Sequence, residues 1–255
     1  MTGDPAEMSD PTDGAPLDSV SFEQNADAAL ARYRVQGFHI ESGILPARDC
    51  DELVAAALTL PNAASGTFGP IPMPHRVHPK FLAVMRYPPI VEIVETLIGA
   101  KASGIGGEFF YMRPGTAGFT AHQDNYYVEA PTEAFLSVWI ALCDVGPDNG
   151  GLVFYPGSHK LGPLPVREGQ TLSDAGQNPA AQAIECLVPV GAPAVPIHLK
   201  KGSIAFFHGL LAHYSYPNSS DRFRYSFLAT YIRAGAPFKP GRTQQRTEID
   251  LHTLS

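Results

Sequence analysis

The sequence predicts an α+β protein that is mainly β, with helices leading into an antiparallel sandwich or barrel. Up to residue 104, apolar residues recur every three or four positions, as they do on the buried face of a helix. Beyond that point the chain consists of short aromatic and β-branched runs separated by Gly, Pro and Asn turns. Strands that follow one another without intervening helices favour antiparallel pairing. We therefore expect N-terminal helices that flank a β-rich core.

The first part of the chain is expected to contain a tail, three helices and one strand. Residues 1–19 are rich in Asp, Pro, Gly and Ser, and ordering them would cost conformational entropy with little apolar burial in return. We expect a disordered tail at 1–19 and a single domain over 20–255. Three helices are expected: one at 21–37 with Ser21 as N-cap, one at 46–60 with Pro46 in the first turn, and one at 88–100 with Gly99 near its end. A short strand is expected at 38–45.

Further strands are expected in the second part of the chain, at 107–114, 134–145, 151–156, 194–199, 202–207 and 223–233. The segment 160–190 between them is long and mostly irregular for a compact domain. Such a segment is either a lid or substrate loop, or a surface insertion without a functional role. Its residues do not separate these two interpretations.

Composition and charge limit the classes of partner. The formal net charge is −7 without a cluster of Lys and Arg, which argues against nucleic acid because phosphate binding needs grouped cations. No run approaches the roughly 18 apolar residues of a membrane span, and no signal-like segment opens the chain. The widely spaced Cys50, Cys143 and Cys186 form neither a disulfide framework nor a CxxC metal site. We expect a cytoplasmic protein with a small-molecule substrate and no membrane partner; its oligomeric state is not indicated.

The segment FTAHQDNYYVEA, residues 119–130, carries the first sign of chemistry. On an extended segment residues two apart share a face, so His122 and Asp124 are expected to direct a nitrogen and a carboxylate oxygen to one point. His208 and His213 are candidate third ligands; because they are five apart, only one can face the site from a continuous strand. Two His and one carboxylate with open coordination positions form the facial triad of non-haem Fe(II) oxygenases. An HxD pair alone is weak evidence, so the other motifs must decide.

Three segments, in this order, resemble motifs of the phytanoyl-CoA dioxygenase family of Fe(II)/2-oxoglutarate oxygenases. They are AHQD at 121–124, DNGGLVFYPGSHK at 148–160 and FFHGLLAHYSYPNSSDRFRYSF at 206–227. The similarity runs from about residue 33 to residue 233. The resemblance implies a double-stranded β-helix core (a jelly-roll, or cupin-like, core) and a reaction that uses Fe(II), 2-oxoglutarate and O2.

The resemblance also implies roles for individual residues. It makes His122, Asp124 and His213 the iron ligands and the catalytic centre. It makes Arg224, eleven residues after His213, the partner of the distal carboxylate of 2-oxoglutarate, with Ser215 adding a hydroxyl to the same carboxylate. A planar guanidinium holds a carboxylate through two parallel hydrogen bonds, which suits Arg224 to this role.

Other side chains near the motifs are weaker candidates. Arg222 has the same strand parity as Arg224, and only the motif spacing favours Arg224. Candidate contacts of 2-oxoglutarate are Thr120, Tyr111 and Trp139, of which the last two could equally belong to the core. Candidates for the substrate side are Asn125, Tyr126 and Tyr127, the last of which could also be a core ring. Residues expected outside the metal site are His208 as a supporting side chain, His159 as a turn residue, His75 and His78 at the edge of the cleft, and Arg113 and Arg167 near an anionic substrate or in solvent.

The expected reaction is hydroxylation, or a related oxidation, of a C–H bond of a small metabolite, with release of succinate and CO2. Related halogenases lack the carboxylate ligand, whereas Asp124 is present here. The chain has no basic cluster suited to the CoA phosphates, so we expect a small metabolite of a bacterial biosynthetic or catabolic pathway. Two alternatives stay open. A non-catalytic cupin-like protein that binds a metal or ligand would not need Arg224, and a zinc hydrolase would need a general base beyond Asp124 and Glu129.

Overall fold

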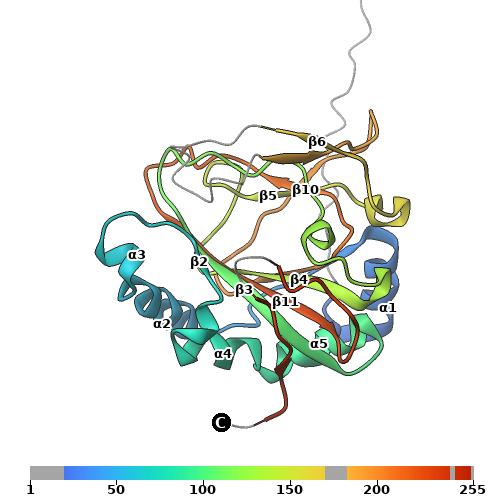
Figure 1. The fold of residues 1–255 in the computed structure, drawn as a ribbon, viewed down its shortest axis with the longest axis horizontal. Helices are drawn as coiled ribbons and strands as arrows, with labels where there is room; N and C mark the ends of the chain where they lie inside the picture. Colours follow the sequence, from blue (N-terminus) through green and yellow to red (C-terminus); the bar gives the residue numbers. More distant parts are fainter. Residues whose placement is uncertain (1–19, 170–182, 242–244, 254–255) are drawn as a thin grey trace, which may run out of the picture.

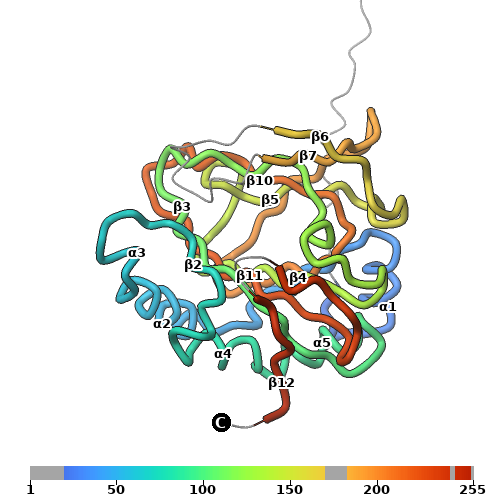
Figure 2. Tube along the Cα trace, in the orientation of Figure 1, coloured from blue at the N-terminus to red at the C-terminus, as the bar shows by residue number. Residues whose placement is uncertain are grey.

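The computed structural model describes residues 20–169, 183–241 and 245–253, which form two facing β-sheets with helices over the outer face of the larger sheet (Figure 1). The expected tail at 1–19 lies outside the described residues. The smaller sheet lies on the side away from the helices, as the chain trace also shows (Figure 2). Two such sheets around a shared interior are the architecture of a double-stranded β-helix, which confirms the expected fold class.

Three helices begin and end close to the positions that the sequence indicates. They are α1 (Phe22–Gln36), α2 (Ala47–Leu58) and α5 (Pro88–Ile98). The Ser21 hydroxyl accepts a hydrogen bond from the Gln24 amide at 3.1 Å and thereby caps α1. Gly37 and Gly99, with φ of 84° and 70°, end α1 and α5 in the left-handed conformation that favours glycine.

Several short elements were not predicted. They are α3 (Pro61–Ala64), β2 (Ile71–Pro72), the 3-10 helix η1 (Pro74–Arg76), α4 (Pro79–Met85) and β12 (Ile249–Asp250). The longest of them has seven residues, which is about two turns of helix and too short for a clear apolar period.

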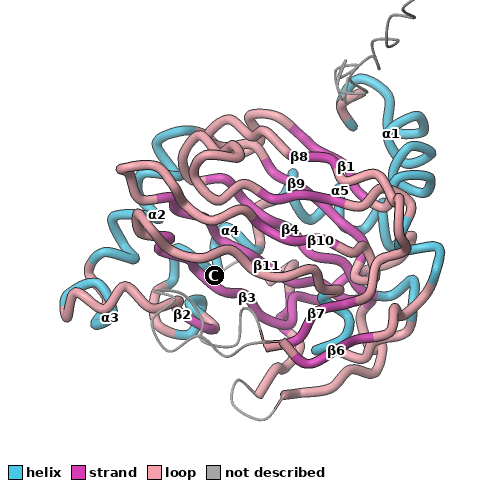
Figure 3. The backbone as a smooth tube through the Cα atoms, turned by 90° about the horizontal axis from the view of Figure 1, so that it is seen from above, coloured by secondary structure: helices cyan, strands magenta, loops and turns pink. Residues whose placement is uncertain are grey.

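The larger sheet is antiparallel throughout and carries most of the expected strands. Its order is β1 (Phe38–Glu41), β9 (Ile204–His208), β4 (Phe135–Ala141), β11 (Arg224–Arg233), β3 (Ala102–Met112) and β12, with β2 paired to β3. Figure 3 shows β1, β9, β4, β11 and β3 side by side. The central strand β11 pairs along its length with β3 on one side and β4 on the other.

The smaller sheet contains β10 (His213–Ser215), β5 (Leu152–Phe154) and β8 (Val195–Pro196). A separate hairpin pairs β6 (Val166–Glu168) with β7 (Ile184–Cys186). This hairpin and the 3-10 helix η4 (Ser158–Leu161) are regular elements that the sequence did not indicate within 160–190, whose other described residues are irregular. Residues 170–182 lie outside the described residues, so the choice between lid and surface insertion stays open.

Strand parity decides which side chains reach the interior between the sheets. Phe109 of β3 and Phe227 of β11 pack with the helices in one hydrophobic core, whose other members include Phe81, Ile90 and Val94. Successive side chains of a strand point to opposite faces of the sheet. Phe110 and Leu228, the next residues on the same two strands, therefore point into a cavity between the two sheets. In the described residues, no helix has the length and apolarity needed to cross a membrane.

Candidate active site

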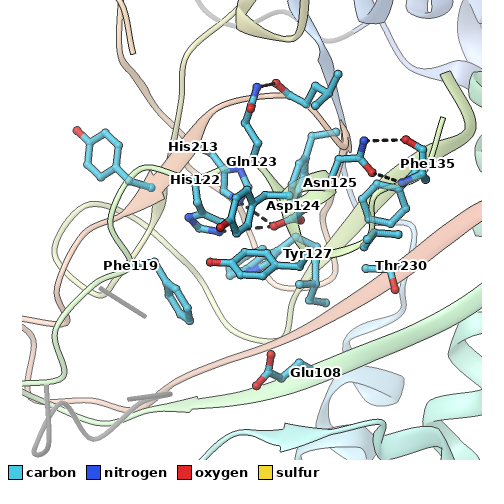
Figure 4. Close-up of a pocket in the computed structure, with 18 of the residues that line it drawn as sticks. Glu108, Phe119, His122, Gln123, Asp124, Asn125, Tyr127, Phe135, His213 and Thr230 are labelled. Atoms are coloured by element: carbon cyan, nitrogen blue, oxygen red, sulfur yellow. Dashed lines mark hydrogen bonds and ion pairs between the residues drawn. The ribbon is translucent and has the colours of Figure 1, made fainter. Parts of the chain in front are cut away.

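A cavity of about 900 Å³ opens between the two sheets and contains the predicted site. The larger sheet contributes one wall through β3, β11 and β4, and the segment 119–130 contributes the opposite one. Aromatic rings and a few polar groups line it, and Figure 4 shows Glu108 on one side of the cavity and His122, Asp124 and His213 on the other. A largely apolar cavity with a few convergent polar groups is the usual form of a small-molecule site.

His122 and His213 are joined through their backbones. The His122 amide donates to the His213 carbonyl at 2.8 Å, and the His213 amide donates to the His122 carbonyl at 3.0 Å. This isolated antiparallel bridge places the two imidazole rings 4.2 Å apart between centroids. The motif at 121–124 thus meets the start of β10, although the two segments are distant in sequence.

The expectation that the HxD motif lies on an extended segment is only partly right. Asp124 opens a 3-10 helix, η2 (Asp124–Tyr127), and only Gln123 between the two ligands has extended φ and ψ of −120° and 125°. One extended residue is enough to put His122 and Asp124 on the same side. The buried Gln123 amide anchors this turn, donating to the carbonyls of Gly162 and Leu210 and accepting from the Leu164 amide.

The donor atoms of the three predicted ligands converge. Oδ1 of Asp124 lies 3.5 Å from Nε2 of His122 and 3.7 Å from Nε2 of His213. One ligand atom from each residue lies within 4.8 Å of the others, and no other His, Cys, Asp or Glu group with this geometry occurs in the described ranges. The three atoms therefore lie at the mutual distances at which one ion can bridge them.

The surroundings of each ligand direct its donor atom to this point. Nδ1 of His122 lies 2.7 Å from the Thr120 carbonyl and Nδ1 of His213 lies 3.0 Å from the Leu211 carbonyl. A ring nitrogen that donates to a carbonyl leaves the other nitrogen, Nε2, as an acceptor or metal ligand. The Ser137 hydroxyl of β4 donates to Oδ2 of Asp124 at 2.5 Å, which leaves Oδ1 on the side of the histidines.

Burial keeps His213 neutral. Loss of hydration is the main reason that its pKa falls to about 4, and the nearby His122 lowers the pKa further. A neutral imidazole has the free lone pair that a metal requires, so the ring is ready for coordination at neutral pH.

His208 does not join the site. Strand β9 ends at His208, and the turn that follows reverses the chain before β10 begins at His213. The ring of His208 lies 5.1 Å from that of His159, its Nδ1 accepts from the Leu210 amide, and its Nε2 has no hydrogen bond. Nε2 is 3.6 Å from the carboxylate of the exposed Glu133. Only one of the two histidines faces the candidate metal position. The reason differs from the sequence expectation, because the two lie on separate strands and not on one continuous strand.

Arg224 is a buried cation without an ionic partner. Arg224 is 3% exposed, and no carboxylate in the described residues lies within ion-pair distance of its guanidinium. Nη1 donates to the Ser226 hydroxyl at 2.5 Å, Nη2 lies 2.7 Å from the sulfur of Met112, and Nε has no hydrogen-bond partner. Burial lowers the pKa of Arg224 to about 10. A buried guanidinium normally has a counter-charge, so this one has the properties of an anion site.

The immediate neighbours of Arg224 hold it in place. Its guanidinium carbon lies 5.3 Å from the ring centre of Trp139, a cation–π arrangement. Gly150 has φ of 86°, and a Cβ there would come within 2.1 Å of the Met112 sulfur and 3.4 Å of Nη2 of Arg224. The DNGG turn thus needs glycine at this position. By contrast, the side chain of Arg222 is 71% exposed, next to Asp148.

The remaining candidates for 2-oxoglutarate contact divide into two groups. Ser215 and Trp139 line the cavity, and the Ser215 hydroxyl accepts a hydrogen bond from the Phe119 amide at 2.9 Å. Thr120 is not among the lining residues, because its hydroxyl donates to the Ile184 carbonyl at 2.9 Å. Tyr111 is buried in the helix-facing core, where its hydroxyl donates to the Ala57 carbonyl. The predictions for Thr120 and Tyr111 are therefore corrected, the second because its strand parity is opposite to that of the cavity wall.

The substrate-side candidates also differ from one another. The Asn125 side chain is bonded in both directions to the backbone of Ala130, so it closes a turn and its polar atoms are not directed at a ligand. Tyr126 and Tyr127 line the cavity and are 44% and 41% exposed, which places them at its rim. Tyr127 is therefore not a core ring.

None of the other histidines and arginines from the sequence analysis lines the cavity. His78 caps α4 by accepting from the Lys80 amide, His75 lies in η1, and His159 contacts the Arg34 carbonyl. Arg167 pairs with Glu185 on the exposed hairpin. Four residues that line or support the site were not singled out from the sequence: Gln123, Ser137, Glu108 and Arg246. The strand parity that places Glu108 on the same face as Phe110 was the only sequence signal available for it.

Comparisons with known proteins identify relatives for most of the chain. The model of the family described as Phytanoyl-CoA dioxygenase (PhyH) matches residues 33–226. Phytanoyl-CoA dioxygenase domain-containing protein 1 of Mus musculus is 27% identical over 182 residues, which cover 68% of this chain and 60% of the mouse protein. The matched part therefore spans less than two thirds of that relative.

Solved structures share the fold. The non-heme alpha ketoglutarate dependent carbocyclase SnoK from nogalamycin biosynthesis has a TM-score of 0.72 at 22% identity, and the similarity covers 93% of this chain and 98% of that chain. The epimerase SnoN, in complex with Fe3+, alpha ketoglutarate and nogalamycin RO, has a TM-score of 0.68 at 23% identity and covers 89% and 95%.

Proposed function

Because this chain belongs to the phytanoyl-CoA dioxygenase family, we propose that it is an oxygenase that oxidises a C–H bond of a small-molecule metabolite. The cofactors of the family are Fe(II), 2-oxoglutarate and O2. When bound together, they supply the oxidising power and release succinate and CO2. The observation that carries the proposal is that a buried, unpaired guanidinium and a 2-His-1-carboxylate group line one cavity.

The residues of the chain have separate tasks in this reaction. His122, Asp124 and His213 are proposed to hold the ion, because their donor atoms converge and their other polar atoms are engaged. Three protein ligands leave coordination positions open for cosubstrate and oxygen. Arg224 is proposed to bind the distal carboxylate of 2-oxoglutarate, and Trp139 covers its guanidinium.

Ser215 is proposed to support the same carboxylate, because it lies on the cavity wall while its hydroxyl already accepts from the Phe119 amide. That amide fixes the oxygen and leaves the hydroxyl proton for an anion. The apolar side chains of Leu152, Phe207 and Leu228 line the same cavity and keep water away from the reacting groups.

The cationic groups of the cavity argue against an acyl-CoA substrate. Two cations line it besides Arg224. Lys239 is paired with Glu129 at 2.5 Å, and Nη1 of Arg246 donates to the carbonyls of Tyr127 and Lys239. A CoA thioester would require a group of free cations for its phosphates. A metabolite that fits within the cavity is favoured instead, and the two similar structures from nogalamycin biosynthesis support a role in a biosynthetic pathway.

The proposal is tested by anaerobic titration of the protein with Fe(II) and 2-oxoglutarate. Chelation of the ion by 2-oxoglutarate is expected to produce a weak visible charge-transfer band, and the absence of this band in the wild-type protein would overturn the proposal. Exposure of the chelate to O2 with a metabolite panel should then release succinate. A band without succinate release under any condition would identify a non-catalytic binding protein.

A further inference from the structure

A carboxyl group without a partner occupies the cavity wall that faces the candidate metal centre. Glu108 lies in β3 and points into the cavity, across from His122, Asp124 and His213 (Figure 4). Within the described ranges, its carboxylate makes neither a hydrogen bond nor an ion pair. The residue is partly buried, so its carboxylate faces the cavity and can accept a hydrogen bond from whatever fills it. A ligand that binds there can replace the water next to this carboxylate.

The sheet register places Glu108 away from both the ion and 2-oxoglutarate. Leu228 of β11 pairs with Glu108 on one side and with Trp139 of β4 on the other. Asp124 is bonded to Ser137, also on β4, so the metal side of the cavity lies two strands away from Glu108. Two strand spacings correspond to about 10 Å, which leaves room for a ring system between them.

The charges of the cavity favour a neutral substrate. Asp124 and Arg224 are occupied by the ion and by 2-oxoglutarate in the proposed function, and Glu129 is paired with Lys239. One acidic group, Glu108, and one cation, Arg246, remain, and they influence each other electrostatically. An ammonium group near Glu108 would also face Arg246, and a carboxylate or phosphate near Arg246 would face Glu108. A hydroxyl group avoids both repulsions.

Both walls of the cavity around Glu108 are suited to rings. Phe110 and Phe119 lie with their rings 5.8 Å apart in an edge-to-face arrangement, and Tyr126 and Tyr127 stand 5.2 Å apart at the rim. All four line the cavity. Aromatic walls stack well on flat or cyclic scaffolds and provide few hydrogen bonds of their own. A single carboxylate in such surroundings has a large effect on which polar group is accepted.

From these observations we infer that the substrate is a neutral, ring-bearing alcohol, and that Glu108 accepts a hydrogen bond from its hydroxyl group. Glu108 is then a specificity-determining residue, because it selects the hydroxyl and sets the position of the ring relative to the metal centre. The inference rests on the proposed function and adds the chemical class of the substrate.

The test uses binding, so it does not depend on knowing the natural substrate. The full-length protein is loaded with 2-oxoglutarate and with Zn(II) in place of iron. Probes are neutral ring alcohols, each with its methyl ether and the primary amine of the same skeleton, for example 4-phenylcyclohexanol, its methyl ether and 4-phenylcyclohexylamine. Dissociation constants are measured by saturation-transfer NMR. The wild-type protein is expected to bind the alcohols about 10-fold more tightly than the ethers, the effect of one well-placed hydrogen bond.

Variants at position 108 connect this preference to the carboxylate. Glu108→Leu should bind alcohol and ether equally, whereas Glu108→Gln should keep part of the preference because its amide oxygen still accepts. Glu92→Gln, on the exposed face of α5, is the matched control and should behave as the wild type. Removing an unpartnered carboxyl should not impair folding, and thermal unfolding of each variant checks this.

Several results would overturn the inference: wild-type binding of ethers or amines as tight as that of alcohols, no binding of any alcohol, or an unchanged preference in Glu108→Leu. The charge-transfer band of the Fe(II)–2-oxoglutarate chelate keeps the two proposals apart. If the wild type and Glu108→Leu both form the chelate, a failed alcohol preference counts against the role of Glu108 alone. If the wild type forms no chelate, the proposed function fails.

Discussion

Replacement of Arg224 by methionine is expected to weaken 2-oxoglutarate binding without destabilising the ligand-free protein. Burial lowers the pKa of this guanidinium from 12.5 to about 10. At 1.36 kcal/mol per pKa unit, this corresponds to about 3 kcal/mol of unfavourable free energy for burying the cation. Loss of the hydrogen bond to Ser226 costs about 1–3 kcal/mol, because that buried hydroxyl is left without its donor. The two terms nearly cancel, so the melting temperature of Arg224→Met should stay within a few degrees of the wild type or rise.

The ligand-bound states should differ clearly. Two charge-assisted hydrogen bonds to a carboxylate contribute roughly 1.5–3 kcal/mol each, so the loss of the guanidinium should weaken 2-oxoglutarate at least about 100-fold. At 100 times its Kd, a ligand stabilises the folded state by about 2.7 kcal/mol, which is about 5–10 °C in melting temperature for a protein of this size. Thermal unfolding with Mn(II), with and without 2-oxoglutarate, should show this shift in the wild type and lose it in Arg224→Met.

The matched control is Arg222→Met, which removes an exposed guanidinium two residues away, just before β11 begins. It should retain the full 2-oxoglutarate shift. Equal shifts in Arg224→Met and the wild type would refute the assignment of the carboxylate clamp. A ligand-free Arg224→Met that melts more than about 10 °C lower would refute the argument that the buried cation is unfavourable without its anion.

The remaining predictions concern the ligands and Glu108. His213→Ala should abolish the charge-transfer band, whereas His208→Gln should keep it; the reverse result would mean that the third ligand is wrongly assigned. Ser137→Ala should weaken Mn(II) binding about 10-fold in a titration, because the hydroxyl that orients Asp124 is lost. Burial raises the pKa of Glu108 from 4.5 to about 7, so the folded state holds this proton more tightly than the unfolded state. Stability of the metal-free protein should therefore fall between about pH 4.5 and pH 7, by on the order of 2 kcal/mol, and urea unfolding of Glu108→Gln should lack this component.

The main strands and the three longer helices could be predicted because each has its own local signal. In β4 and β11 the signal is a run of β-branched and aromatic residues, and in α1 it is a cap, an apolar period and a terminal glycine. The short α4 and β2 have no such signal, because a few residues cannot define a period. Their positions depend on contacts such as the pairing of Ile71 with Phe109, which only the folded chain provides.

The candidate metal centre could be predicted because its geometry depends on motifs. The spacing of the closing motif favours His213 over His208, and in the structure the two histidines lie on separate strands, with the ring of His213 beside that of His122. For Tyr111 no such motif exists, so the sequence leaves open whether it contacts 2-oxoglutarate or belongs to the core. In the second half of β3, Phe109 and Tyr111 face the helices and Glu108 and Phe110 face the cavity, but the sequence does not say which face is which, because both carry aromatic rings.

The fold places Glu108 in an environment that its sequence neighbours do not indicate. In the sequence it stands between Gly107 and Phe109, and a lone charge in a strand is usually assigned to a solvent-facing side. In the structure, helices cover one face of β3, and its edges are paired with β11 on one side and with β2 and β12 on the other. The only direction left for a polar side chain in mid-strand is the cavity. A carboxyl group in that position loses hydration unless a ligand replaces the water, so its presence is better explained by what binds there than by what stabilises the sheet.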